Sequence, residues 1–136
     1  MLNTKKIIFK NSDFHRNNNI LIVEDEYNLR NNLARFLSFR GYNVTTAENG
    51  AQAVELIKLQ EFHIMLIDLR LPDINGIDIL KEIKLAGLNI ACLVMTANAS
   101  LISVIDAFKY GANDYLEKPF SLTELGQKIK LFDMFV

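Results

Sequence analysis

The fold is decided by residues 62–76, which read FHIMLIDLRLPDING. The apolar run that begins at Phe62 ends at Asp68, and a turn-prone loop that contains Pro72 and Gly76 follows it. A short apolar run bounded by turn residues is typical of a strand buried on both faces of a parallel sheet. An unpaired carboxylate is too costly to bury. The stretch therefore predicts a buried strand that delivers Asp68 to a solvent-facing edge.

Two other apolar runs end in polar residues in the same way. Residues 19–23 lead into Glu24 and Asp25, and residues 90–95 lead into Thr96. In an open parallel sheet, the carboxyl ends of the strands border the crevice in which ligands bind. We therefore expect these acidic and hydroxyl side chains to meet Asp68 in one crevice.

Strand-like and helix-like segments alternate along the chain from Ile20 onward, and Gly41, Gly87 and Gly111 stand where helices are expected to end. Ser121 is a predicted N-cap, with Glu124 completing a capping box. The predicted strands span about 19–24, 42–47, 62–67, 90–95 and 113–117, and the predicted helices span about 26–40, 50–60, 75–84, 100–110 and the residues after Ser121. This alternation predicts a doubly wound α/β sandwich with right-handed crossovers.

Composition narrows the class of protein. The chain has 136 residues, of which 50% are hydrophobic and 23% charged, and this predicts one globular domain. The net charge of −1 gives no reason to expect contact with nucleic acid or a membrane. No apolar run approaches the length of a membrane span, and the single cysteine, Cys92, is predicted to be a buried thiol. We expect a protein of the reducing cytoplasm.

Residues 1–18 differ from the rest of the chain because they are polar and lack a long periodic pattern. We interpret them as a mostly irregular extension, with a short additional strand as the alternative, and residues 19–136 as the domain. The apolar residues 7–9 are too few for a secretion signal.

Glu24, Asp25 and Asp68 would repel one another in a shared crevice, so a cation has to offset their charge. Mg²⁺ is the natural candidate because it prefers oxygen ligands and retains several waters, and Mn²⁺ is able to substitute for it. We expect Asp25 and Asp68 to bind the metal directly. The backbone carbonyl of Arg70 would add a ligand, and Glu24 would act through water.

Lys118 is the predicted second cation, because it lies at the carboxyl end of the last predicted strand. Pro119 holds Lys118 in extended geometry, and a cis bond between the two residues is an alternative to the more common trans form. With a metal, this ammonium and the Thr96 hydroxyl around it, Asp68 would be the nucleophile of a phosphoryl transfer that forms an acyl phosphate.

The chain resembles the receiver (response regulator) domain of two-component signalling over about residues 19–132. The resemblance rests on four motifs in order, which are VEDE at 23–26, LIDLRLPDING at 66–76, VMTA at 94–97 and GANDYLEKPF at 111–120. It implies the flavodoxin-like strand order 2-1-3-4-5. Each motif falls at the carboxyl end of a predicted strand.

The resemblance also implies roles for residues and partners. Asp68 would accept phosphate from a sensor histidine kinase, Lys118 would match the lysine of the family, and Thr96 and Tyr115 would be the switch residues. The domain would then control an effector protein or an output domain, without being an enzyme beyond its own phosphorylation and dephosphorylation. The family also suggests a phosphorylation-dependent homodimer through the last strand and its flanking helices.

Two other functions fit the same residues less well. A phosphatase of the haloacid dehalogenase type would need an aspartate at position 70, where Arg70 stands. A dinucleotide-binding module would need a glycine-rich turn after the first strand, where the chain has acidic residues instead. His15 and His63 suggest a phosphorelay histidine, but we expect both to be structural or solvated. Asp73 is assigned to turn chemistry only.

Overall fold

The computed structural model describes residues 19–134, and the predicted extension at residues 1–18 lies outside this range. A five-stranded parallel sheet forms the centre, in the order β2-β1-β3-β4-β5. The strands are β1 (Asn19–Val23), β2 (Asn43–Ala47), β3 (Ile64–Asp68), β4 (Ala91–Thr96) and β5 (Ala112–Glu117). The predicted doubly wound sheet and its strand order are confirmed.

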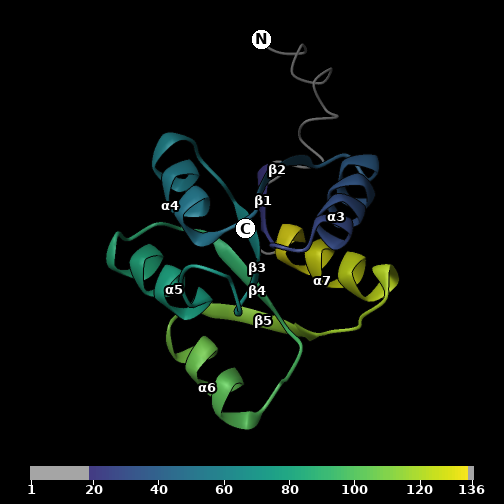
Figure 1. Cartoon of the computed structure of the whole chain (residues 1–136). Helices are drawn as coiled ribbons and strands as arrows, with labels where there is room; N and C mark the ends of the chain where they lie inside the picture. Colours follow the sequence, from purple (N-terminus) through teal and green to yellow (C-terminus); the bar gives the residue numbers. More distant parts are fainter. Residues whose placement is uncertain (1–18, 135–136) are drawn as a thin grey trace.

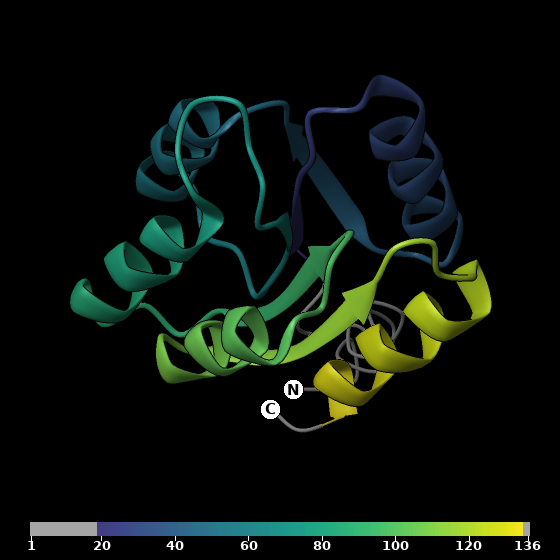
Figure 2. The ribbon, with the colours of Figure 1, turned by 60° about the horizontal axis from the view of Figure 1, so that its bottom comes forward.

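Five helices cover the sheet in the described part of the chain (Figure 1). They are α3 (Tyr27–Phe39), α4 (Gly50–Leu59), α5 (Gly76–Leu85), α6 (Leu101–Lys109) and α7 (Leu122–Met134). Figure 2 shows α6 and α7 on either side of β5, the last strand of the sheet. Helices α3 and α7 share one face, and α4, α5 and α6 share the other.

Two apolar cores follow from the alternation of side chains along the strands. In β1, Leu21 and Val23 pack under α4 and α5, whereas Ile20 and Ile22 pack under α3 and α7. A parallel sheet covered on both faces needs apolar residues at every position of its inner strands, because successive side chains point to opposite faces. This is why β1 and β3 read as continuous apolar runs.

The helix ends agree closely with the sequence pattern. Gly41, Gly87 and Gly111 follow three helices and have φ angles of 97°, 70° and 106°. This left-handed conformation favours glycine because other residues have a Cβ atom that crowds the backbone. Ser121 accepts a hydrogen bond from the backbone N–H of Glu124 at 3.0 Å, which confirms the predicted N-cap. The Glu26 carboxylate caps α3 by accepting from two N–H groups of its first turn.

Most predicted bounds of strands and helices agree with the structure to within one residue, and two other details are worth noting. Strand β3 begins at Ile64 instead of Phe62 and includes Asp68 as its last residue, in register with Met95 of β4. The peptide bond between Lys118 and Pro119 is cis, the less common of the two forms considered. Among residues 19–134, no helix combines the length and apolar character needed to cross a bilayer.

Candidate functional site

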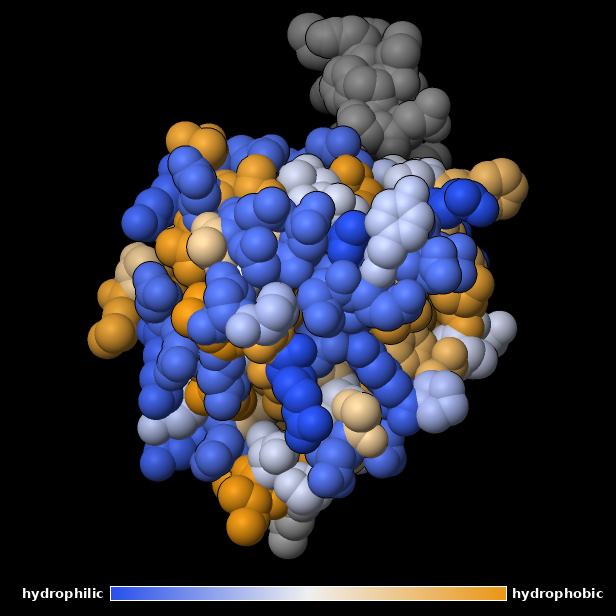
Figure 3. Space-filling model, viewed as in Figure 1, coloured by the Kyte–Doolittle hydropathy of each residue, from blue (hydrophilic) through white to orange (hydrophobic). Residues whose placement is uncertain are grey.

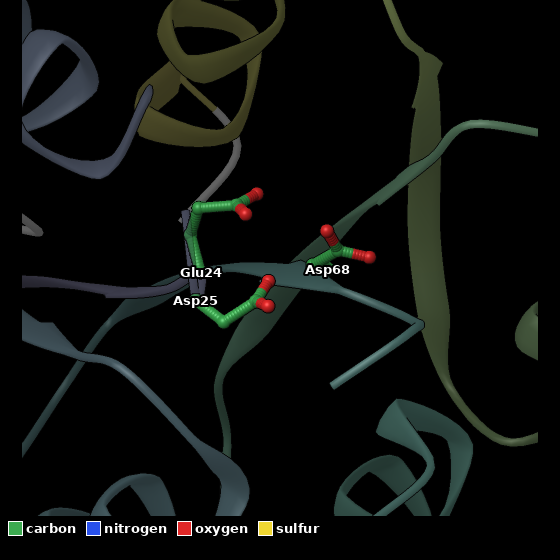
Figure 4. A group of neighbouring side chains, drawn as sticks. All are labelled: Glu24, Asp25 and Asp68. Carbon is green, nitrogen blue, oxygen red and sulfur yellow. The ribbon is translucent and has the colours of Figure 1, made fainter. Parts of the chain in front are cut away.

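Three carboxylates meet at the carboxyl edge of the sheet. Glu24 and Asp25 follow β1, Asp68 ends the neighbouring strand β3, and the side chains of the two strands converge (Figure 4). One carboxylate oxygen from each residue lies within 4.8 Å of the others. Glu24 and Asp68 are buried, and Asp25 is exposed to solvent. The expectation that Asp68 faces solvent is therefore wrong, because a cationic side chain pairs with its carboxylate inside the protein. The parallel register of β1 and β3 therefore brings together the acidic side chains that the sequence predicts to meet.

Lys118 joins two of these carboxylates. Its ammonium donates to Glu24 Oε1 at 2.8 Å and to Asp68 Oδ2 at 2.5 Å. Burial raises the pKa of Glu24, and the hydrogen bond from Lys118 only partly opposes this effect. Burial also acts to lower the pKa of Lys118, but the hydrogen bonds and charges of Asp68 and Glu24 outweigh it and raise that pKa. The ammonium is thus held charged against two buried acids.

Arg30 supports the backbone of the acidic pair. Its Nη1 atom donates to the carbonyl oxygens of Glu24 at 2.9 Å and of Asp25 at 3.2 Å. Arg30 is buried on α3, and among residues 19–134 no carboxylate forms an ion pair with it. Sequence reasoning missed this residue. The only available signal is an arginine one helical turn after the acidic pair, at a position where the helix faces the sheet.

The loop after Asp68, residues 69–75, is called the acceptor loop here. The N–H of Arg70 donates to Asp68 Oδ1 at 2.8 Å, and Arg70 pairs with Asn75 in an isolated antiparallel bridge. The N–H of Gly76 closes the loop by donating to the carbonyl of Leu69 at 2.8 Å. A Cβ atom at Gly76 would lie 2.8 Å from the carbonyl oxygen of Asp68, so this position has room only for glycine. The loop is therefore closed directly against Asp68.

Thr96 ends β4 and Tyr115 lies on β5, so both lie on the side of β3 that faces away from β1. The Thr96 hydroxyl donates to the carbonyl of Asn98 and accepts from its N–H, both at 3.1 Å, so it is engaged within its own loop. The half-buried Tyr115 ring lies 6.4 Å from the ring of Phe108 in an edge-to-face arrangement.

A pocket of about 330 Å³ opens elsewhere, between α4 and α5. A smaller one of about 240 Å³ lies beside Thr96. Its lining residues are Leu69, Arg70, Asn75, Ile77, Thr96, Asn98, Ser103 and Asp106.

The donor set fits a hard divalent cation. Converging carboxylate oxygens are the ligands that Mg²⁺ prefers, and the exposure of Asp25 leaves room for the waters that this ion retains. Histidine and cysteine ligands, which softer metals prefer, do not contribute to any metal-sized group in residues 19–134. The acidic cluster can therefore hold a metal.

The other residues considered as functional candidates in the sequence do not join the acidic cluster. His63 precedes β3 at its amino end, the opposite end from Asp68, and its Nδ1 atom is buried. His15 lies outside the described residues. Asp73 does more than turn chemistry, because its carboxylate accepts from the N–H groups of Gly50 and Ala51 on α4. That assignment was incomplete, since no local pattern links positions more than twenty residues apart.

The fold and the site together define a doubly wound α/β domain with an acidic, lysine-bridged cluster at the carboxyl edge of its sheet. Residues 20–130 match the family model described as the response regulator receiver domain. The chain belongs to this family, which confirms the resemblance seen in the sequence motifs.

Curated relatives and a solved structure agree with this assignment. The chain is 37% identical over 114 residues to the transcriptional regulatory protein CrdR of Helicobacter pylori, covering 83% of this chain and 54% of that protein. It is 37% identical over 110 residues to the response regulator SaeR of Staphylococcus aureus, covering 81% of this chain and 48% of that protein. The chain thus spans about half the length of these relatives.

The solved structure is a CheY-like response regulator receiver domain protein from Methanospirillum hungatei JF-1. It has a TM-score of 0.80 and 30% identity, and the match covers 85% of this chain and 92% of that one. This likeness confirms the flavodoxin-like fold.

Proposed function

We propose that Asp68 accepts a phosphoryl group from the phosphohistidine of a sensor histidine kinase in a Mg²⁺-dependent reaction. The observation that carries this proposal is the Lys118 ammonium, which bridges Asp68 and the buried Glu24 within a cluster of three carboxylates. Two cations, a bound metal and Lys118, would then flank one nucleophilic carboxylate. Phosphoryl transfer requires this arrangement because charge spreads over the equatorial oxygens of the transferred group.

The reaction is an exchange of bonds at phosphorus. A carboxylate oxygen of Asp68 attacks, the bond from phosphorus to the histidine nitrogen breaks, and the leaving imidazole takes the bonding electron pair. The product is an acyl phosphate on Asp68. Asp25, Asp68 and the Arg70 carbonyl would hold a bound Mg²⁺, with Glu24 acting through water, and this ion would neutralise charge. Mn²⁺ would substitute for it. Lys118 binds a phosphoryl oxygen from the opposite side.

Thr96 and Tyr115 are the proposed switch. A phosphoryl group adds about −1.5 to −2 units of charge and three acceptor oxygens. The Thr96 hydroxyl would exchange its bonds with Asn98 for a phosphoryl oxygen, and the Tyr115 ring would turn into the vacated space. Shifting the populations of the inactive and active conformations from 1:99 to 99:1 requires about 5.5 kcal/mol of differential stabilisation. One or two charge-assisted hydrogen bonds of about 1.5–3 kcal/mol each supply much of that.

The partners follow from this switch. We propose a sensor histidine kinase as the donor and an effector protein or output domain as the recipient of the signal. We propose no membrane contact and no direct nucleic-acid contact by residues 19–136, which we take as the receiver domain, with residues 1–18 as an extension. The domain would assist only its own phosphorylation and dephosphorylation. A cytoplasmic location stays a prediction.

The test is labelling by acetyl phosphate, with intact mass and peptide mapping as the measurement. The wild-type protein should gain one phosphoryl group only when Mg²⁺ is present, and Asp68→Asn should gain none. Asp78→Asn is the control, because it removes an exposed carboxylate from the start of α5 without touching the crevice. Undiminished labelling of Asp68→Asn at another residue would overturn the proposal.

A further inference from the structure

Asp73, at the tip of the acceptor loop, contacts a helix that precedes it by more than twenty residues. Its Oδ1 atom accepts from the N–H of Gly50 at 2.8 Å, and its Oδ2 atom accepts from the N–H of Ala51 at 2.9 Å. These N–H groups belong to the first turn of α4, where backbone donors have no partner within the helix. The local N-cap, Asn49, serves a different donor, the N–H of Gln52. Asp73 therefore completes the cap from outside the helix.

Gly50 and Ile74 make the same junction sterically tight. A Cβ atom at Gly50 would overlap the Cγ1 and Cδ1 atoms of Ile74, the residue after Asp73. Gly50 is thus required for the close approach of the loop. The loop and the start of α4 meet through two hydrogen bonds and a contact that leaves no free space.

The charge of Asp73 suits this junction. Hydrogen bonds from Gly50 and Ala51 lower the pKa of Asp73, because they stabilise the ionised carboxylate. Asp73 is thus an anion at the positive end of the α4 macrodipole. The junction, called here the Asp73 clamp, consists of Asp73, Gly50, Ala51 and Ile74.

The other end of the acceptor loop belongs to the phosphoacceptor site. The Arg70 N–H donates to Asp68, and Arg70 pairs with Asn75 across the loop. The carbonyl of Arg70 is the proposed metal ligand, and it lies on a loop closed at its base by Gly76. If the tip is released, the Arg70 carbonyl is held only by these contacts at the base of the loop.

We propose that Asp73 is a positioning residue that sets the affinity of the site for Mg²⁺. By clamping the tip of the acceptor loop to α4, it holds the Arg70 carbonyl at the place where it completes the ligand set of Asp25 and Asp68. This inference rests on the proposed function, because it takes the crevice to be a metal site. It differs from a simple capping role, which would affect the stability of α4 and leave metal binding unchanged.

The first experiment measures Mg²⁺ affinity of the full chain by isothermal titration calorimetry. Groups that orient a ligand from outside the coordination shell typically change affinity by about 10- to 100-fold, so Asp73→Ala should weaken Mg²⁺ binding about tenfold. Asp73→Asn keeps one acceptor oxygen and should give an intermediate loss. Amide hydrogen exchange at Gly50 and Ala51 should quicken in Asp73→Ala, because their N–H groups lose the carboxylate that accepts from them.

Two controls separate positioning from stability and from charge. Asn49→Ala removes the local cap of the same helix without touching the loop, so it should lower stability and leave Mg²⁺ affinity within twofold of wild type. Asp78→Ala removes the same unit of charge from an exposed site and should also keep the wild-type affinity. If Asn49→Ala weakens Mg²⁺ binding as much as Asp73→Ala does, the positioning role is wrong.

A second pair of variants tests the clamp from the other side and does not depend on the folding of Asp73→Ala. Gly50→Ala should push Ile74 away and weaken Mg²⁺ binding. The double variant Gly50→Ala/Ile74→Ala removes the atoms that clash, so its Mg²⁺ affinity should equal that of Ile74→Ala alone. A wild-type protein that binds no Mg²⁺ would remove the proposed metal site and the inference with it. A wild-type protein that binds Mg²⁺, with Asp73→Ala and Gly50→Ala unchanged from it, would remove the inference alone.

Discussion

Lys118 offsets the repulsion and the burial cost of two carboxylates of the acidic cluster. Glu24 and Asp68 are both buried, and each would be unpaired without the ammonium between them. A buried charge that loses its partner retains the whole cost of its desolvation. The same ammonium is the proposed partner of a phosphoryl oxygen. Lys118 would therefore stabilise the folded protein before phosphorylation and bind the phosphoryl group afterwards.

Lys118→Met should lower the free energy of unfolding by about 3 kcal/mol at pH 7, because it leaves two buried carboxylates without a cation. Urea denaturation in metal-free buffer measures this. Lys128→Met is the matched control, since Lys128 forms a 2.8 Å ion pair with the partly exposed Asp114 away from the crevice. The control should lose about 1 kcal/mol or less. Equal losses in both variants would contradict the role of Lys118.

Arg30→Met should lower the free energy of unfolding by about 2 kcal/mol, because the carbonyls of Glu24 and Asp25 lose a charged donor. The guanidinium also lies 5.6 Å from the centre of the Tyr27 ring, a contact that methionine does not replace. Urea denaturation again provides the measurement. Arg35→Met, at an exposed position on the same helix, should change stability little, and a comparable loss there would refute the argument.

Helix α6 differs from its neighbours at the scale of whole elements because one of its faces lacks a partner in the described structure. Ile102, Ile105 and Phe108 are 74%, 53% and 43% exposed. Figure 3 shows apolar surface at the bottom of the molecule, where α6 lies in Figure 1. Tyr115 on β5 contacts Phe108. The proposed switch residue therefore borders this exposed face.

We expect phosphorylation to drive self-association through the α6 face. Sedimentation velocity should show a monomer without ligand and a dimer with Mg²⁺ and beryllofluoride, which mimics the phosphoryl group. Ile105→Ser should remain a monomer under both conditions, because it removes apolar area from the α6 face. Leu85→Ser is the control, since Leu85 is 87% exposed on α5 and should not affect the dimer.

A wild-type protein that stays monomeric with beryllofluoride would exclude phosphorylation-driven self-association. Dimerisation of Ile105→Ser to the wild-type extent would place the interface elsewhere on the surface.

The fold of the whole molecule brings together residues that are far apart in the sequence. Glu24 and Lys118 are 94 positions apart, and Asp68 and Lys118 are 50 apart, yet all three meet at one edge of the sheet. A ligand that binds only to this assembled site stabilises the entire fold by mass action. Metal binding should therefore be visible in global unfolding.

Mg²⁺ at ten times its dissociation constant should raise the free energy of unfolding by about 1.4 kcal/mol, because only the folded chain holds the site. Urea denaturation with and without Mg²⁺ measures the increment. Asp25→Asn should lose most of it, and Asp78→Asn should keep it. The same increment in Asp25→Asn as in wild type would show that Mg²⁺ stabilises the protein from another place.

The sequence was sufficient for the fold and for most of the candidate site. Continuous apolar runs predicted buried parallel strands, glycines marked three helix ends, and acidic residues after two runs predicted the crevice. These features are local, since strand burial, left-handed turns and helix caps depend on residues close together in the chain.

Other features were decided only by tertiary structure. The bridge from Lys118 to Glu24, the donation of Arg30 to two carbonyls and the clamp of Asp73 on α4 each join separate elements. Side-chain hydrogen bonds of this kind depend on the distance and direction between atoms after the sheet and helices have packed. A pattern along one chain states which residues reach the same edge, whereas only the packed fold determines which of their atoms touch.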